Sequence, residues 1–187
     1  FAAARDQLGR VAKDAEALPW AKQEAAYLAA ESYLDEGNAP EAEKQLAGFK
    51  SAFPKSKWVT SATAARARAL LALDKIEDAK SEFASLKKLP GVPEEIGVEA
   101  DYSVVRIDYA VAVNKGDQAG LANAQKGFEA LLQKTSGKSQ FERTSRLAQI
   151  GRAACMTYLG KPADAKAELE KAIKDVKDAR VLAAAYN

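Results

Sequence analysis

A short apolar pattern recurs along the chain with one fixed spacing. Each copy begins with alanine and places apolar residues four and seven positions later. The four copies are Ala42, Leu46 and Phe49; Ala79, Phe83 and Leu86; Ala124, Phe128 and Leu131; and Ala165, Leu169 and Ala172. These offsets put the three residues on one face of a helix, and the small leading residue lets another helix approach closely. We call this pattern the packing stripe, and it predicts pairs of packed helices.

The distances between the copies indicate a repeat protein. Successive leading alanines are 37, 45 and 41 residues apart, which is within the range of helical-hairpin repeats. A partial fifth copy, Ala4, Leu8 and Val11, lies close to the first residue. We therefore expect the sequence to open inside a repeat and to be a piece of a longer chain.

The composition also favours helices. Alanine supplies 41 of the 187 residues, whereas the chain has 11 glycines and 6 prolines. This balance favours helix over sheet on intrinsic propensity. With 48% hydrophobic residues the chain can bury a sizeable core. The predicted fold class is all-α.

A second motif precedes the stripes and marks the first helix of each hairpin. It consists of an arginine, seven residues, a turn former and a lysine. It occurs as RARALLALDK (66–75), RIDYAVAVNK (106–115) and RAACMTYLGK (152–161). The turn formers are Gly37 in the first copy and then Asp74, Asn114 and Gly160. These residue types tolerate positive φ, which suits a tight helix exit.

Capping chemistry is expected at several helix starts. A polar residue three positions before a glutamate can accept a hydrogen bond from a free backbone N–H while the glutamate reaches back. The pairs are Asn38 with Glu41, Asp74 with Glu77, and Ser139 with Glu142. The third hairpin departs from the others, because ten residues rather than five separate Asn114 from Ala124. Its loop or its second helix should be longer by about one turn.

These signals predict a single repeat domain over residues 1–187. One such hairpin cannot bury its apolar face alone, so neighbouring hairpins must stack into an α-solenoid. The expected elements are a helix at 2–17, hairpins at about 20–52, 57–89, 94–134 and 140–176, and a terminal helix ending by residue 187.

The hairpins resemble the tetratricopeptide repeat (TPR) family over nearly the whole chain. Gly37, Ala42 and Pro54 match the turn glycine, the early alanine of the second helix and the closing proline of that family. The small first-helix residue of the family is matched by Ala30, Ala67 and Ala153, whereas Ile107 departs from it. The segment FPKSKW (53–58) is also similar to repeats of bacterial envelope proteins such as outer-membrane assembly lipoproteins.

The resemblance implies a right-handed superhelix whose first helices line a concave groove. A segment of a partner protein is expected to bind there. The residues expected to contact it are Tyr27, Glu31, Asp35, Arg68, Asp108 and Tyr158. A carboxylate clamp of the kind found in chaperone-binding relatives needs Lys, Asn and Arg at the groove positions. Because only Arg68 is basic there, a C-terminal carboxylate is a poor candidate ligand.

Other conspicuous residues have a structural and a functional interpretation. Arg66, Arg106 and Arg152 could line a ligand site, but their regular recurrence favours pairing between helices. Cys155 lies among small and apolar residues, where a buried hydrophobe is expected more than a reactive thiol. Trp20 and Trp58 stand at the starts of first helices, where packing against the preceding hairpin is favoured over stacking on a ligand.

The sequence argues against an enzyme. It contains no histidine, the commonest general base and metal ligand, and no glycine-rich phosphate loop. We therefore expect no catalytic residues, cofactor or metal, and a protein-interaction module instead. The alternative is a structural scaffold that assembles with itself through the ends of the solenoid.

The charge and the single cysteine bear on the partner and the compartment. A net charge of +2, with both signs interspersed, does not make a phosphate-tracking surface, so nucleic acid is not expected as a partner. No apolar run approaches the roughly 20 residues that span a bilayer. Cys155 alone cannot close an intrachain disulfide. The bacterial cytoplasm and the periplasm or cell envelope both stay open, the latter slightly favoured by the resemblance.

Overall fold

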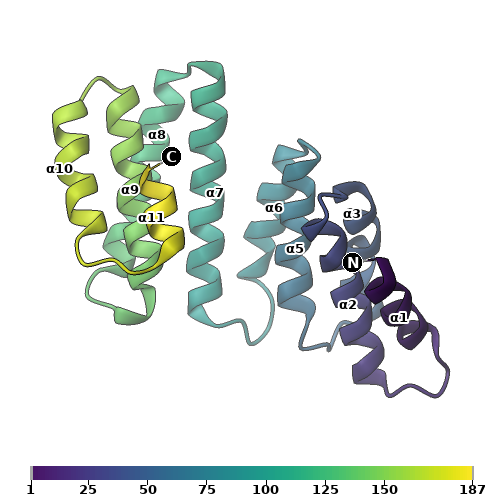
Figure 1. Ribbon diagram of the computed structural model, residues 1–187. Helices are drawn as coiled ribbons and strands as arrows, with labels where there is room; N and C mark the ends of the chain where they lie inside the picture. Colours follow the sequence, from purple (N-terminus) through teal and green to yellow (C-terminus); the bar gives the residue numbers. More distant parts are fainter. Residues whose placement is uncertain (1, 187) are drawn as a thin grey trace. The chain divides into compact units, whose positions relative to one another are not determined.

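The computed structural model describes residues 2–186, and each regular element among them is helical (Figure 1). The chain divides into two compact units, one up to Val92 and one from Pro93. The first unit contains α1 (Ala2–Lys13), α2 (Pro19–Asp35), α3 (Ala39–Ala47), α4 (Phe49–Ala52), α5 (Val59–Ala72) and α6 (Ile76–Leu86). The second unit contains α7 (Glu94–Lys115), α8 (Gln118–Thr135), the 3₁₀ turn η1 (Ser139–Phe141), α9 (Glu142–Tyr158), α10 (Pro162–Ile173) and α11 (Ala179–Tyr186). The predicted all-α class of helical hairpins is confirmed.

The packing stripe forms the buried side of the second helices, except that Phe49 of the first stripe lies on the short helix α4, after α3 ends at Ala47. Every member of the stripes at 42–49, 79–86 and 124–131 is buried, and the leading alanines Ala42 and Ala79 are fully enclosed. In the last copy Leu169 is half-buried between two buried alanines. The first helix of each hairpin packs against this side, as α5 does against α6 and α7 against α8.

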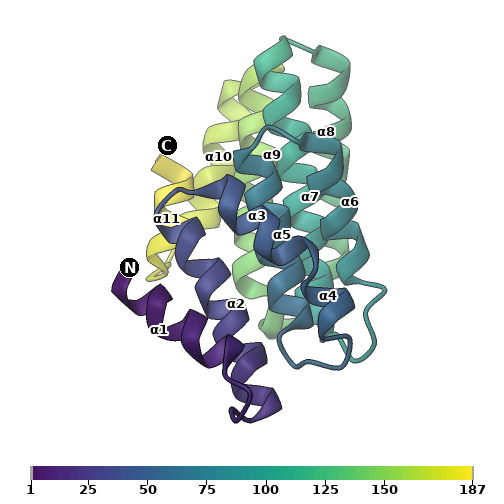
Figure 2. The same cartoon turned by 90° about the vertical axis from the view of Figure 1, so that its right-hand side faces the viewer.

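The partial stripe on α1 is the exception. Ala4 is exposed, Leu8 is half-buried and Val11 is 38% exposed. α1 lies along α2 (Figure 2), which is the helix that it packs against. It ends at Lys13 rather than at residue 17 as expected. This stripe is therefore left uncovered within residues 2–186.

A residue with positive φ follows the first helix of each hairpin. In the third hairpin this residue differs from the predicted one. Gly37 (φ 77°), Asp74 (φ 57°) and Gly160 (φ 77°) take the predicted positions. In the third hairpin α7 runs through Asn114 to Lys115, and Gly116 (φ 62°) makes the exit. The assignment of Asn114 as this turn was wrong, because a glycine two residues later adopts positive φ without a Cβ penalty.

The extra residues of the third hairpin lie in its helices. α7 has 22 residues and α8 has 18, whereas α5 and α6 have 14 and 11. α8 starts directly after Asp117, whose carboxylate accepts a hydrogen bond from the Gly120 N–H at 2.9 Å. Of the two alternatives for the longer spacing, the structure shows a longer second helix.

Only one of the three predicted caps forms. Asn38 Oδ1 accepts from the Glu41 N–H at 3.3 Å, as expected. Asp74 instead occupies the left-handed turn, and α6 begins after Lys75 without a side-chain cap. Ser139 opens the 3₁₀ turn η1, and its backbone carbonyl accepts from the Glu142 N–H. The predictions for Asp74 and Ser139 were wrong because each residue takes part in the preceding turn.

Cys155 lies in the core of the second unit. It is fully buried with Phe128, Phe141 and Ala148. Burial raises the pKa of its thiol to about 11, and a hydrogen bond with the backbone opposes this rise. The interpretation of Cys155 as a small buried hydrophobe is confirmed.

The first prediction concerns the leading alanines. Replacing Ala42 or Ala79 by Phe should lower the free energy of unfolding by about 1 to 3 kcal/mol, because an aromatic ring cannot fit between the paired helices. The matched controls are Ala47→Phe and Ala84→Phe, at exposed positions of α3 and α6, with changes within about 0.5 kcal/mol. Urea unfolding followed by circular dichroism measures both sets, and equal midpoints for core and control variants would show that the stripe register is wrong.

The second prediction concerns Cys155. With a pKa of about 11, only about one thiol in a thousand ionises at pH 8, and the thiolate is the reactive form. Labelling with Ellman's reagent should therefore be at least about a hundredfold slower in the native protein than in guanidinium chloride. Rapid stoichiometric labelling of the native protein would contradict the buried assignment.

Candidate functional site

In the first unit, the predicted partner-binding residues lie on α2 and α5. Arg68 Nη2 donates to Glu31 Oε1 at 2.6 Å, and the Arg68 side chain is about half exposed. Asp35 is exposed one turn after Glu31, at the end of α2. The structure thus brings Glu31 and Arg68 into direct contact. We call Glu31, Asp35 and Arg68 the acidic–arginine patch.

Tyr27 does not belong to this patch. It is buried, and its ring stacks on Trp58 with centroids 4.8 Å apart and planes 17° apart. The expectation that Tyr27 is exposed was wrong, because position along a helix does not reveal an aromatic partner on the next hairpin. For Trp58, the expected packing against the preceding hairpin is confirmed. Tyr27 therefore fixes α2 against the start of α5.

In the second unit, Asp108 and Tyr158 lie on α7 and α9. Asp108 is half-buried, whereas Tyr158 is 52% exposed. The ring of Tyr109 meets that of Tyr158 edge-on at 6.2 Å. Burial raises the pKa of Tyr109, with smaller contributions from Tyr158 and Cys155. Tyr109 was missed by the sequence analysis, although it follows Asp108 directly. A single groove from Tyr27 to Tyr158 stays a prediction.

Two of the three recurring arginines join helices. Arg66 on α5 donates from Nε and Nη2 to Glu43 of α3 and from Nη1 to Glu82 of α6, at 3.0 to 3.2 Å. Arg152 on α9 donates to Glu168 of α10 at 2.5 Å. Pairing between helices is thus confirmed at both positions.

The glutamate partners carry a sequence signal that was overlooked. Glu82 and Glu168 each stand three residues after the leading alanine of their stripe. Gly127 takes this place in the third hairpin. Arg106 is exposed and makes no ion pair within residues 2–186, so the expectation of pairing was wrong for this residue.

A groove of about 900 Å³ lies among α1, α2 and α3. It occurs where the first hairpin lacks the arginine. Ala29 stands eight residues before Gly37, as Arg66 stands eight before Asp74. Ala29 lines the groove together with Arg5 of α1 and Gln45 of α3.

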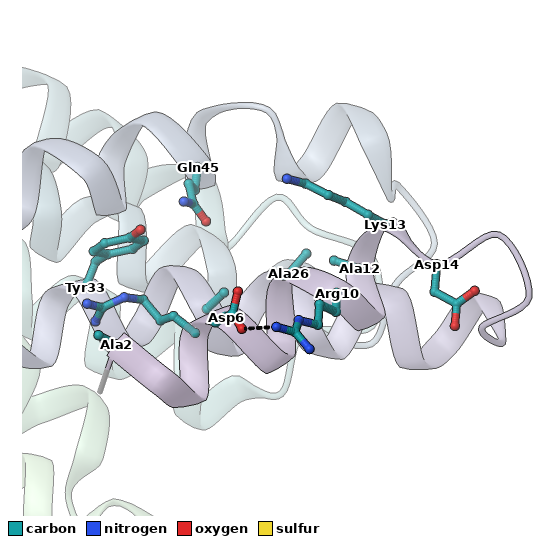
Figure 3. A pocket seen from close by; sticks show the side chains of 12 residues that line it. Ala2, Asp6, Arg10, Ala12, Lys13, Asp14, Ala26, Tyr33 and Gln45 are labelled. Carbon is teal, nitrogen blue, oxygen red and sulfur yellow. Dashed lines mark ion pairs between the residues drawn. The ribbon is translucent and has the colours of Figure 1, made fainter.

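The charged groups around this groove are largely neutralised. Arg5 Nη1 lies 2.5 Å from Glu36 Oε2, and its guanidinium group covers the Tyr33 ring at 4.2 Å. Arg10 pairs with Asp6 at 2.8 Å, as the dashed line in Figure 3 marks. The groove is open to solvent. Its lining presents apolar surface that another molecule could pack against, rather than a reactive group.

Exposed apolar side chains concentrate in the N-terminal part of the first unit. They are Val11, Leu18, Trp20 and Leu28. Trp20 is 57% exposed at the start of α2. The expectation that Trp20 packs against a preceding hairpin was wrong within the described chain.

Within residues 2–186, no group of three or more His, Cys, Asp or Glu side chains is placed to hold a metal ion. None of the helices described combines the length and apolar character needed to cross a bilayer.

The comparisons with known proteins support the fold. No family model matches the chain, and no curated protein matches it. Among solved structures, it is similar to the nearly identical TPR-like repeats of a Podosopora anserina protein assigned as a kinesin light chain. The TM-score is 0.66 at 16% sequence identity, over 90% of this chain and 81% of the other. At this identity the likeness shows the fold alone, and the predicted TPR-like helical repeat is confirmed.

Proposed function

We propose that the protein is a non-catalytic interaction module that holds a segment of a partner protein on its first helices. The observation that carries this proposal is the set of charged and aromatic side chains that stay outside the core on these helices. They are Glu31, Asp35 and Arg68 in the first unit and Tyr158 in the second. TPR-like folds typically serve as such scaffolds, which agrees with the absence of histidine from the sequence.

The side chains at these positions suit partner binding for physical reasons. Rigid aromatic rings and arginines are the common anchors of protein interfaces. Tyr158 already rests edge-on against Tyr109, so little side-chain entropy remains to be lost on binding. Arg68 is held by Glu31, and alternating charge fixes the register of a bound segment more than its affinity.

The proposal can be tested once a partner is identified by pull-down and mass spectrometry from the source organism. Calorimetry should then show that Arg68→Gln or Tyr158→Ala weakens binding by about thirtyfold, the effect of losing a hot-spot side chain of about 2 kcal/mol. Both side chains are about half exposed, so circular dichroism should show an intact fold. Tyr27→Ala is unsuitable, because it removes a core contact.

The matched control is Lys171→Gln. Lys171 is exposed on α10, which is the second helix of the last hairpin. Its affinity should equal that of the parent. Undiminished affinity of both first-helix variants, with their fold intact, would move the binding site away from the first helices.

Self-assembly through an end is the second candidate function. It is supported by the uncovered stripe on α1 and by the exposed Val11 and Trp20 in the same part of the first unit. Every other stripe faces the first helix of its own hairpin. A second copy of the chain could cover α1 in the same way.

Sedimentation velocity from micromolar to millimolar concentration tests this candidate. If the chain self-associates through this end, the weight-average mass should rise with concentration, and Val11→Glu or Trp20→Glu should abolish the rise. Tyr158→Glu, an exposed aromatic position of the second unit, should leave it unchanged. A constant monomer mass for the parent chain would dismiss self-assembly.

A further inference from the structure

A pocket of about 370 Å³ lies within the second unit. Its lining combines Tyr102, Ser103 and Arg106 of α7 with Arg143 and Thr144 of α9, and α11 contributes Ala184. None of these residues was singled out for partner binding. The pocket is notable because two guanidinium groups from different helices line it.

Arg106 of α7 and Arg143 of α9 both line the pocket together with Tyr102. Burial raises the pKa of Tyr102, and the charges of Arg106 and Arg143 both oppose this rise. The pocket lining therefore carries positive charge from two helices.

Neither of these two arginines forms a short ion pair with another residue of the described chain. The Arg106 side chain makes no hydrogen bond or ion pair within residues 2–186. Arg143 Nε lies 3.6 Å from Asp178 Oδ2, which is longer than a charge-assisted hydrogen bond of about 2.7 to 2.9 Å. Arg66, by contrast, pairs with glutamates on two neighbouring helices. Arg152 pairs with Glu168 through Nη2, whereas its buried Nε has no hydrogen-bond partner among the described residues.

Thr144 supplies a hydroxyl group to the pocket lining. The residue is only 6% exposed, but its hydroxyl oxygen is not one of the buried polar atoms that lack a hydrogen-bond partner among the described residues. Thr144 lies in the first turn of α9, where the free backbone N–H groups carry partial positive charge. The Ser103 hydroxyl group already donates to the Glu99 carbonyl.

We propose that this pocket binds a single oxyanion group, a carboxylate or a phosphate. Arg106 and Arg143 act as its charge partners, and the Thr144 hydroxyl donates a hydrogen bond to it. Guanidinium groups suit this role because their planar N–H forks match the oxygens of carboxylates and phosphates. The Glu99 carboxylate, on the same lining, opposes the anion and limits its affinity.

The test is an NMR titration of the protein, labelled at the tyrosine Cζ carbons, with sodium phosphate and separately with sodium acetate at constant ionic strength. The Tyr102 signal should shift and saturate. Arg106→Gln should weaken binding about tenfold, as the loss of a charged hydrogen-bond partner does. Glu99→Gln should strengthen it, because a like charge is removed. Saturation by phosphate alone assigns the pocket to a phosphoryl group, and saturation by acetate assigns it to a carboxylate.

The control is Lys126→Gln, which removes one positive charge from an exposed position of α8. This variant should bind the anion as the parent does. The proposal is overturned if neither anion saturates the Tyr102 shift, or if Arg106→Gln and Lys126→Gln weaken binding equally. Because Arg106 is exposed and unpaired in the described chain, its replacement tests binding without removing a fold contact.

Discussion

The close approach of paired helices at an alanine is the contact on which the rest of this structure depends. The leading residue of all four complete stripes is alanine, and each of these alanines is buried. Because no larger side chain stands there, the backbones of the two helices can come together and the apolar residues four and seven positions later can interlock. Gly151 allows a similar approach, since a Cβ atom there would lie within van der Waals overlap of the Phe128 ring.

Helix pairing could be predicted from the sequence because the stripe is a local pattern. The turns at Gly37 and Gly160 could also be predicted, because each helix end there needs only one residue with positive φ. Asn114 misled the prediction because two nearby residues could end α7, and Gly116 does so at lower conformational cost. Local spacing identifies the candidates for a helix exit, but the competition between them is decided by backbone energetics.

The surface was harder to predict because it depends on contacts between helices distant in sequence. Tyr27 occupies a position that the TPR resemblance assigns to a groove, yet Trp58 from the next hairpin buries it. Glu31 and Arg68 were each predicted to contact a partner, but nothing in the sequence indicated that they would pair with one another. In a repeat protein the core follows from each repeat, whereas the surface follows from the particular neighbours that each repeat meets.

The arginine motif shows how identical sequence signals acquire different roles. Arg66 and Arg152 each have a glutamate three residues after the leading alanine of their hairpin, so their charge is used in holding helices together. Glycine replaces that glutamate in the third hairpin, and the charge of Arg106 is left for the pocket beside Tyr102. The first hairpin has neither member, because Ala29 stands in place of the arginine and Gln45 in place of the glutamate, and both residues line a groove. The pocket and the groove therefore both lie where a hairpin lacks this arginine–glutamate pair.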